Sequence, residues 1–138
     1  MSRTPFQEPS RCRVLLVEDD TDAAEVMAIF IRLYGLEVLI ASSGQHALEI
    51  AGTFDPEIVL CDLTLPDMSG LDVLQGMRSQ ESTKNALLVI LSARGERDLM
   101  QLQQTADASA VDVFLSKPIT RESLDMLLSH IHGSRGRG

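Results

Sequence analysis

A run of four aliphatic residues that leads directly into three acids, at residues 14–20 (VLLVEDD), constrains the fold of this chain more than any other stretch. An unbroken aliphatic run is typical of a strand buried on both faces, as at the centre of a parallel sheet. The acids Glu18, Asp19 and Asp20 follow where that strand ends, and open α/β sheets bind ligands outside the carboxyl ends of their strands. Crowded carboxylates repel one another unless a cation or a proton joins them, so a cation-binding edge is indicated. For Asp20, capping of the next helix is an equally good interpretation.

Four more aliphatic runs follow, at residues 36–41, 57–61, 86–91 and 111–115. Segments with helical spacing or helix start and stop signals alternate with them, at about residues 20–34, 43–53, 71–79, from 96 onward and 120–132. Five strands that alternate with five helices predict a parallel sheet with helices on both faces. We therefore expect a single α/β domain, a doubly wound, flavodoxin-like (βα)5 fold with strand order 2-1-3-4-5.

The first helix carries a wide apolar arc. Helical spacing predicts that six of its residues face the sheet: Ala23, Val26, Met27, Phe30, Ile31 and Tyr34. Ile29 and Leu33 widen the arc beyond what a core contact requires. We interpret this as a broad buried face, with a partner-binding edge as the alternative.

Composition excludes several classes of function. The formal net charge of −8 argues against direct nucleic-acid binding, which needs a basic surface. No apolar run approaches the roughly 20 residues that span a bilayer, and residues 1–12 have no signal-peptide core, so we expect a cytoplasmic protein without a membrane partner. Cys12 and Cys61 lack metal-ligand spacing. We expect residues 1–12 to form a flexible arm and residues 133–138 a disordered tail.

Polar residues also follow the later strands. Asp62 follows the third, Ser92 the fourth and Lys117 the fifth, and the expected strand order brings all of them to the edge that carries Glu18 and Asp19. Carboxylates with water suit a hard divalent cation such as Mg²⁺. A lysine opposite the ion would neutralise an oxyanion between them, and phosphoryl transfer needs that arrangement because its transition state spreads charge over equatorial oxygens.

The motifs in this order are VED at 17–19, CD at 61–62, LPDMSG at 65–70, SA at 92–93 and KP at 117–118. Together they resemble the response-regulator receiver domain of two-component signal transduction, of the chemotaxis-regulator-like type, over residues 13–132. The resemblance implies that Asp62 accepts a phosphoryl group from a phosphohistidine on a histidine kinase or a histidine phosphotransfer protein. It also implies a switch in a surface that binds a downstream protein partner. No separate enzymatic activity is expected beyond self-catalysed phosphorylation and dephosphorylation of Asp62.

The resemblance also assigns the surrounding residues. Mg²⁺ (or Mn²⁺) would be held by Asp19 directly, by Glu18 through water, by Asp62, and by the backbone carbonyl of Thr64. Ser92 is the expected switch hydroxyl and Lys117 the expected partner of the phosphoryl group. Phe114 stands at the aromatic switch position, where tyrosine is frequent, so its switching would rest on burial of the ring.

One residue and one segment remain to be related to the family, Pro118 and the segment around residues 106–110. Pro118 resembles a proline that often follows a cis bond. The segment around residues 106–110 is longer than usual, which bears on the geometry of the preceding helix and the fifth strand.

Three other functional interpretations of the sequence are a phosphatase, a flavin-binding module and a part of a longer signalling protein. A small phosphatase with an aspartyl nucleophile needs a second acid two residues after the nucleophile, where this chain has Thr64. A flavin-binding module needs hydroxyls and glycines in its first loop, and the acids at 18–20 would repel a flavin phosphate. The chain is also compatible with a receiver excised from a hybrid histidine kinase or a longer regulator.

Overall fold

The structure, a computed structural model, describes residues 12–137, with side chains as far as residue 131. Its centre is a sheet of five parallel strands in the order β2-β1-β3-β4-β5, which confirms the predicted fold. The strands are β1 (Arg13–Val17), β2 (Glu37–Ala41), β3 (Ile58–Asp62), β4 (Leu87–Ser92) and β5 (Val113–Ser116). The register places Val17 beside Cys61 and Asp62 beside Leu91, so β1, β3 and β4 end at the same edge.

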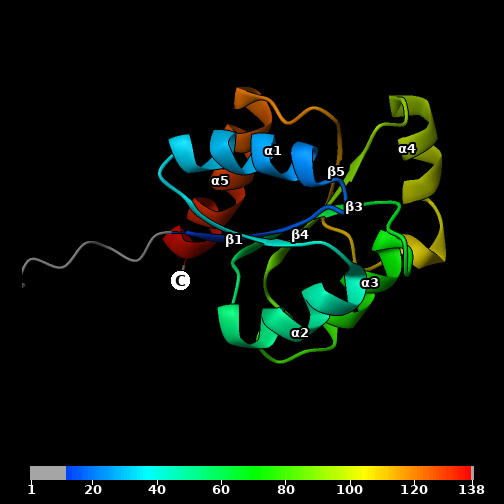
Figure 1. Ribbon diagram of the computed structural model, residues 1–138, viewed down its shortest axis with the longest axis horizontal. Coiled ribbons are helices and arrows are strands. Elements are labelled where there is room, and N and C mark those ends of the chain that lie inside the picture. The colour runs from blue at the N-terminus through cyan, green and yellow to red at the C-terminus, as the bar shows by residue number, and fades with distance from the viewer. Residues whose placement is uncertain (1–11, 138) are drawn as a thin grey trace, which may run out of the picture.

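Helices cover both faces of the sheet (Figure 1). They are α1 (Thr21–Leu33), α2 (Gly44–Phe54), α3 (Gly70–Arg78), α4 (Glu96–Gln103), the one-turn 3₁₀ helix η1 (Ala106–Ala108) and α5 (Arg121–Arg137). Helices α1 and α5 lie on one face, and α2 and α3 lie on the other. No helix among residues 12–137 has the length and apolar character needed to cross a membrane.

The ends of the chain differ from expectation in one respect. Helix α5 continues to Arg137, so the tail predicted as disordered at residues 133–138 is helical as far as it is described. A glycine inside a helix costs only about 1 kcal/mol, so Gly133 does not by itself end α5. The arm predicted at residues 1–12 lies outside the described residues except for Cys12.

Each face of the sheet has its own apolar core, because successive strand residues point to opposite faces. Leu15 and Val17 pack toward α2 and α3, whereas Val14 and Leu16 pack toward α1 and α5. All four are fully buried. Burial of one such side chain stabilises the fold by about 1.5–3 kcal/mol, so these two cores hold the strand ends in place.

Helix α1 is rotated relative to the sequence prediction. The residues buried against the sheet are Ala24, Ala28 and Ile31. Val26, Ile29 and Leu33 are 67%, 58% and 80% exposed, so the prediction of a broad buried face is wrong for this row, which we call the α1 row. Two alanines bring the helix backbone close to the sheet, and that close approach turns the larger side chains outward.

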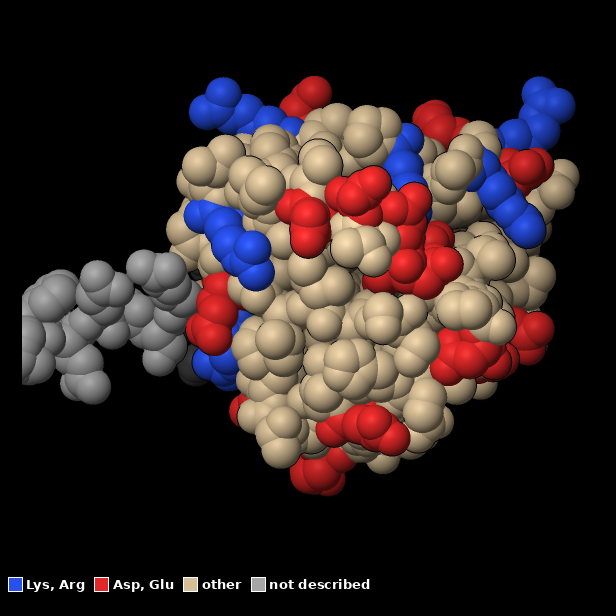
Figure 2. Space-filling model, viewed as in Figure 1, with Lys and Arg blue, Asp and Glu red and all other residues tan. Residues whose placement is uncertain are grey.

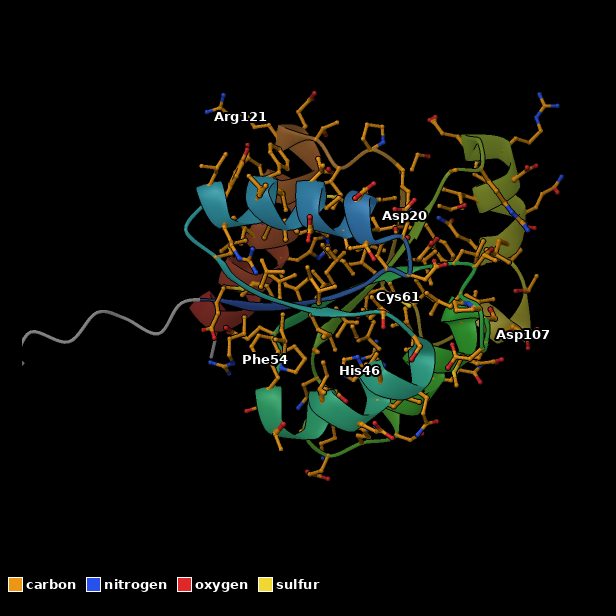
Figure 3. The ribbon with its side chains drawn as sticks, in the orientation of Figure 1. Asp20, His46, Phe54, Cys61, Asp107 and Arg121 are labelled. Carbon is orange, nitrogen blue, oxygen red and sulfur yellow. The ribbon has the colours of Figure 1, made fainter. Side chains whose placement is uncertain are left out.

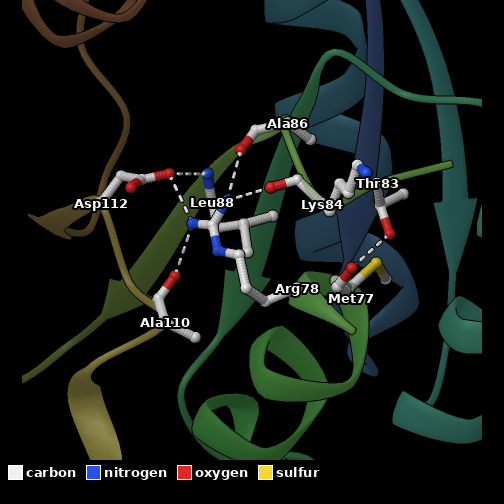
Figure 4. Close-up of polar contacts among 8 residues, drawn as sticks. All are labelled: Met77, Arg78, Thr83, Lys84, Ala86, Leu88, Ala110 and Asp112. Carbon is white, nitrogen blue, oxygen red and sulfur yellow. Dashed lines mark hydrogen bonds and ion pairs between the residues drawn. The ribbon is translucent and has the colours of Figure 1, made fainter. Parts of the chain in front are cut away.

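Arg78, the last residue of α3, joins three separate segments (Figure 4). Its guanidinium donates to the carbonyl oxygens of Lys84, Ala86 and Ala110 at 2.7, 3.3 and 2.8 Å. It also pairs with Asp112 Oδ2 at 2.9 Å, and the same oxygen accepts from the Leu88 N–H. This cluster connects the end of α3, the start of β4 and the segment before β5.

The longer segment between α4 and β5 forms η1 and rests on α3. Gln75 Nε2 of α3 donates to the carbonyl of Asp107 at 3.2 Å, and Figure 3 shows Asp107 beside α3. Arg78 holds the Ala110 carbonyl two residues after η1. The extra residues are therefore fixed to α3 both within η1 and just after it.

Candidate functional site

Three carboxylates meet at the carboxyl ends of β1 and β3. One carboxylate oxygen each from Glu18, Asp19 and Asp62 lies within 4.8 Å of the others. Figure 2 shows acidic side chains gathered where α1 begins and these strands end. Glu18 is 3% exposed, Asp62 is half-buried and Asp19 is exposed, so the cluster is open to water on the Asp19 side and has one deeply buried member.

The donor set fits a hard divalent cation. Carboxylate oxygens with an open, water-accessible side match what Mg²⁺ takes, namely one or two carboxylates with retained waters. Asp20 stands apart from this set because its Oδ1 accepts the Ala23 N–H at 3.2 Å and caps α1. The helix-cap interpretation of Asp20 is therefore confirmed.

A single ammonium group balances the acids. Lys117 Nζ lies 2.7 Å from Glu18 Oε1 and 3.4 Å from Asp62 Oδ2. Burial alone would lower the pKa of Lys117, but the two carboxylates outweigh it and raise the pKa above its ordinary value. The lysine therefore stays protonated and lies on the β5 side of the acids.

Backbone contacts place Lys117. Its N–H donates to the Ser92 carbonyl at 2.8 Å, which extends the pairing of β4 and β5 by one residue. The Lys117–Pro118 peptide bond is cis, as the sequence resemblance led us to expect. The side chain then spans from the end of β5 to the acids that follow β1 and end β3.

Ser92 ends β4 and is 3% exposed. Its Oγ accepts the Arg94 N–H at 3.0 Å. Asp62 at the end of β3 pairs with Leu91 of β4. Ser92, the next residue of β4, therefore lies at the same sheet edge as Asp62. Phe114 of β5 pairs with Ile90 of β4. Its side chain is half-buried and packs against the core on the α2 and α3 face. The two candidate switch residues therefore lie on adjacent strands.

The loop at residues 63–69 connects Asp62 with α3 and is closed at its base. The Leu63 N–H donates to the Leu91 carbonyl, and the Gly70 N–H donates to the Leu63 carbonyl at 2.7 Å. Thr64 and Ser69 form a bridge across the loop. Gly70 also lies so near the Asp62 carbonyl that any Cβ would collide with it, which explains a glycine at this position.

Two features of the site escaped the sequence analysis. The Glu18–Lys117 pair joins residues whose roles had been assigned separately, to the metal and to the phosphoryl group. Asp67 had been grouped only with the turn motif, yet both its oxygens accept backbone N–H groups of α2, from Gly44 and Gln45 at 2.9 Å each. A contact between residues 22 and 23 positions apart leaves no local signal in the sequence.

Cys61, the residue before Asp62, has no role in this polar site. Its thiol is fully buried inside the fold (Figure 3), and burial, followed by the charges of Asp62 and Glu18, raises its pKa far above the ordinary value. The thiol is therefore neutral. It donates weakly to the Asp62 carbonyl at 3.4 Å.

Comparisons with known proteins agree with this geometry. The family model described as the response regulator receiver domain matches residues 14–129. The chain is 32% identical over 120 residues to the cell cycle transcriptional regulator CtrA of Caulobacter vibrioides, covering 87% of this chain and 48% of the relative. It is 38% identical over 105 residues to the transcriptional regulatory protein KdpE of Mycobacterium tuberculosis, covering 76% and 44%. The chain thus spans about half the length of these relatives.

A solved structure is also similar. The CheY-like response regulator receiver domain from Methylobacillus flagellatus superposes with a TM-score of 0.77 at 30% identity, over 88% of this chain and 99% of that one. The similarity extends over nearly all of that domain, so the two chains share the same fold.

Proposed function

Because this chain belongs to the response regulator receiver domain family, we propose that Asp62 accepts a phosphoryl group from a phosphohistidine in a reaction that depends on Mg²⁺. The observation that carries the proposal is the arrangement around Asp62. Carboxylate oxygens of Glu18 and Asp19 lie within 4.8 Å of one on Asp62, and the Lys117 ammonium lies 3.4 Å from Asp62 and 2.7 Å from Glu18. This arrangement fits charge neutralisation of an incoming phosphoryl group.

Each residue has a defined part in this proposal. Asp19 and Asp62 would hold the ion directly, Glu18 through water, and the Thr64 carbonyl from the adjoining loop. A bound Mg²⁺ would neutralise charge on the transferring group. An Asp62 carboxylate oxygen attacks phosphorus and forms the new P–O bond, while the P–N bond to the donor imidazole breaks and its electron pair returns to that ring. Lys117 neutralises a phosphoryl oxygen, and the Ser92 hydroxyl donates to another.

The switch would follow from the new charge. A phosphoryl group adds negative charge and three acceptor oxygens beside Ser92 and Lys117. A Ser92 hydroxyl that turns toward it gives up its present contact with the Arg94 N–H. Phe114 would then fill the space behind β4, which changes the surface formed by α4 and β5 and so the contact with a downstream protein.

The phosphodonor protein, a histidine kinase or a histidine phosphotransfer protein, must approach the acids from outside the sheet edge. Helix α1 begins two residues after Asp19 and presents the α1 row to solvent. An exposed row of apolar side chains on the helix that directly follows these acids suits contact with that donor. We therefore assign the α1 row to the donor interface within this proposal.

The chain is either a free-standing regulator or the receiver module of a longer protein. Its relatives CtrA and KdpE are about twice as long as the matched region and are named as transcriptional regulators. The net charge of −8 supports a receiver that does not itself contact nucleic acid.

Intact-mass measurement tests the proposal. The protein is incubated with acetyl phosphate and Mg²⁺, and the parent should gain about 80 Da, the mass of one phosphoryl group. Asp62→Asn should gain nothing, because the amide is a poor nucleophile, and EDTA should prevent labelling of the parent. Asp72→Asn, an exposed acid on α3, serves as a control that should label normally. Labelling of Asp62→Asn at the parent's rate would overturn the assignment.

A further inference from the structure

Asp67 links the loop beside the acids to a helix elsewhere in the chain. The Gly44 N–H donates to Oδ1 and the Gln45 N–H donates to Oδ2, each at 2.9 Å, so both oxygens of one carboxylate are engaged. These donors open α2, where the helix dipole favours a negative charge. The bonds from Gln45 and Gly44 hold the pKa of Asp67 below its ordinary value.

Helix α2 has its own cap as well. The Ser43 hydroxyl accepts the His46 N–H at 3.1 Å, as an N-cap residue does. The Asp67 contacts therefore add something that the helix does not need in order to begin. Their distinctive effect is to fasten the tip of the loop at residues 63–69 to α2.

Packing reinforces this attachment. Met68 lies against Gly44, and a Cβ placed on Gly44 would lie 2.5 Å from Met68 Cγ and 2.8 Å from Val73 Cγ2. Glycine at this position thus allows the loop tip to approach α2 closely. The base of the loop is fixed by the Leu63 and Gly70 N–H bonds, and the Thr64–Ser69 bridge lies between base and tip.

We propose that Asp67 is a positioning residue for the metal site, because it fastens to α2 the loop that carries the Thr64 carbonyl. The inference rests on the proposed function, in which that carbonyl is a ligand. A backbone carbonyl has no rotamers, so its position is the position of the loop. Mg²⁺ demands near-ideal octahedral geometry, and a loop whose tip is free would present that oxygen less often in the required place. Asp67 itself is not one of the acids that meet at the site.

The test compares Asp67→Ala with two matched variants. Ser43→Ala removes the other cap of α2 and leaves the loop contact intact, and Asp72→Ala removes an exposed acid of equal charge from α3. Mg²⁺ affinity is measured by titration calorimetry, amide hydrogen exchange of Gly44 and Gln45 is measured without metal, and labelling by acetyl phosphate is measured at saturating Mg²⁺. Asp67→Asn, which keeps the side-chain shape but only one acceptor oxygen, provides a milder change.

We expect Asp67→Ala to weaken Mg²⁺ binding by about tenfold, as the loss of an outer-shell partner does, and to speed exchange of both amides. Asp67→Asn should fall between it and the parent. Ser43→Ala and Asp72→Ala should bind Mg²⁺ like the parent, and the labelling rate at saturating Mg²⁺ should stay within about twofold in all four.

Three results would overturn the inference, and they differ in what else they affect. Parent-like Mg²⁺ affinity in Asp67→Ala, or an equal loss in Ser43→Ala, would remove Asp67 as a positioning residue and leave the proposed function standing. A parent protein that binds no Mg²⁺ would overturn the proposed function and this inference with it.

Discussion

Lys117 Nζ lies 2.7 Å from Glu18 Oε1, although the two residues are 99 positions apart in the sequence. Glu18 is almost completely buried, whereas Lys117 keeps about a quarter of its side chain exposed. A buried carboxylate without a partner carries a large desolvation penalty. The lysine that serves the phosphoryl group in our proposal therefore also compensates the deepest acid of the metal site.

Lys117→Met should consequently destabilise the fold. We expect a loss of about 2 kcal/mol in the free energy of unfolding, below the 3–5 kcal/mol of fully buried pairs because the lysine is partly solvated. Urea unfolding measures this loss of stability. Lys84→Met is the control, because Lys84 pairs with Glu81 at 2.8 Å on the surface, and surface ion pairs contribute only about 0–1 kcal/mol. Adding Glu18→Gln should recover part of the loss. Equal losses in the two lysine variants would contradict the account.

Asp19 should contribute to metal binding and little to stability. It is exposed and lies among like charges, so Asp19→Ala should unfold near the parent's urea midpoint while losing most Mg²⁺ affinity. Glu18→Ala should weaken binding less if water intervenes. Asp20→Ala, which removes the α1 cap, should show the opposite pattern, with about 1 kcal/mol less stability and unchanged Mg²⁺ affinity. Calorimetric titration that finds parent affinity in Asp19→Ala would exclude Asp19 as a ligand.

The strand order and the meeting of Glu18, Asp19, Asp62 and Lys117 could be predicted from the sequence because both depend on local patterns. Aliphatic runs mark buried strands, and the residue after each run must lie at the common edge. The orientation of α1 could not be predicted in the same way. Apolar periodicity shows how wide the apolar face of a helix is, but it does not show that Ala24 and Ala28 allow the closest approach to the sheet. Asp67 was missed because its partners are distant in sequence and are backbone groups, which carry no residue signature. Arg78 was missed because three of its four acceptors are backbone carbonyls as well.

Arg78 should be more important to stability than an exposed arginine on a helix end. Arg78→Lys keeps the charge but cannot reach four acceptors, because an ammonium is a point donor and a guanidinium is a fork. We expect Arg78→Lys to cost about 1 kcal/mol in chemical unfolding, because its acceptors are part-buried or exposed and water can replace some of the lost bonds. Arg121→Lys, at the exposed start of α5, should cost almost nothing. If both substitutions have equal effects, the guanidinium contacts are not what joins α3 to β4 and β5.

The α1 row should matter for transfer from a protein donor and not for transfer from a small molecule. Ile29→Ser should slow phosphoryl transfer from a histidine kinase that labels the parent, because an apolar contact with the donor is lost. Labelling by acetyl phosphate should be unchanged, since Ile29 is not one of the residues that cluster around Asp62. Met100→Ser, at a residue of α4 with 61% exposure, is the matched control and should leave both rates unchanged. A slower reaction with acetyl phosphate would show that Ile29→Ser damages the acid cluster itself.

Phe114 should show a smaller switch than a tyrosine at the same position. Its ring is already half-buried against the core, and it has no hydroxyl that favours a solvent-facing position. Full burial of an aromatic ring contributes about 1.5–3 kcal/mol, so the inward position should be populated before phosphorylation. Phosphorylation shifts the populations only by its differential affinity for the two states.

We expect ring resonances, or paired crystal structures with and without a phosphoryl mimic, to show Phe114 inward or in both positions without the mimic. Phe114→Tyr should increase the difference between the two states. A Phe114 ring that is wholly outward without the mimic and wholly inward with it would contradict an inward bias.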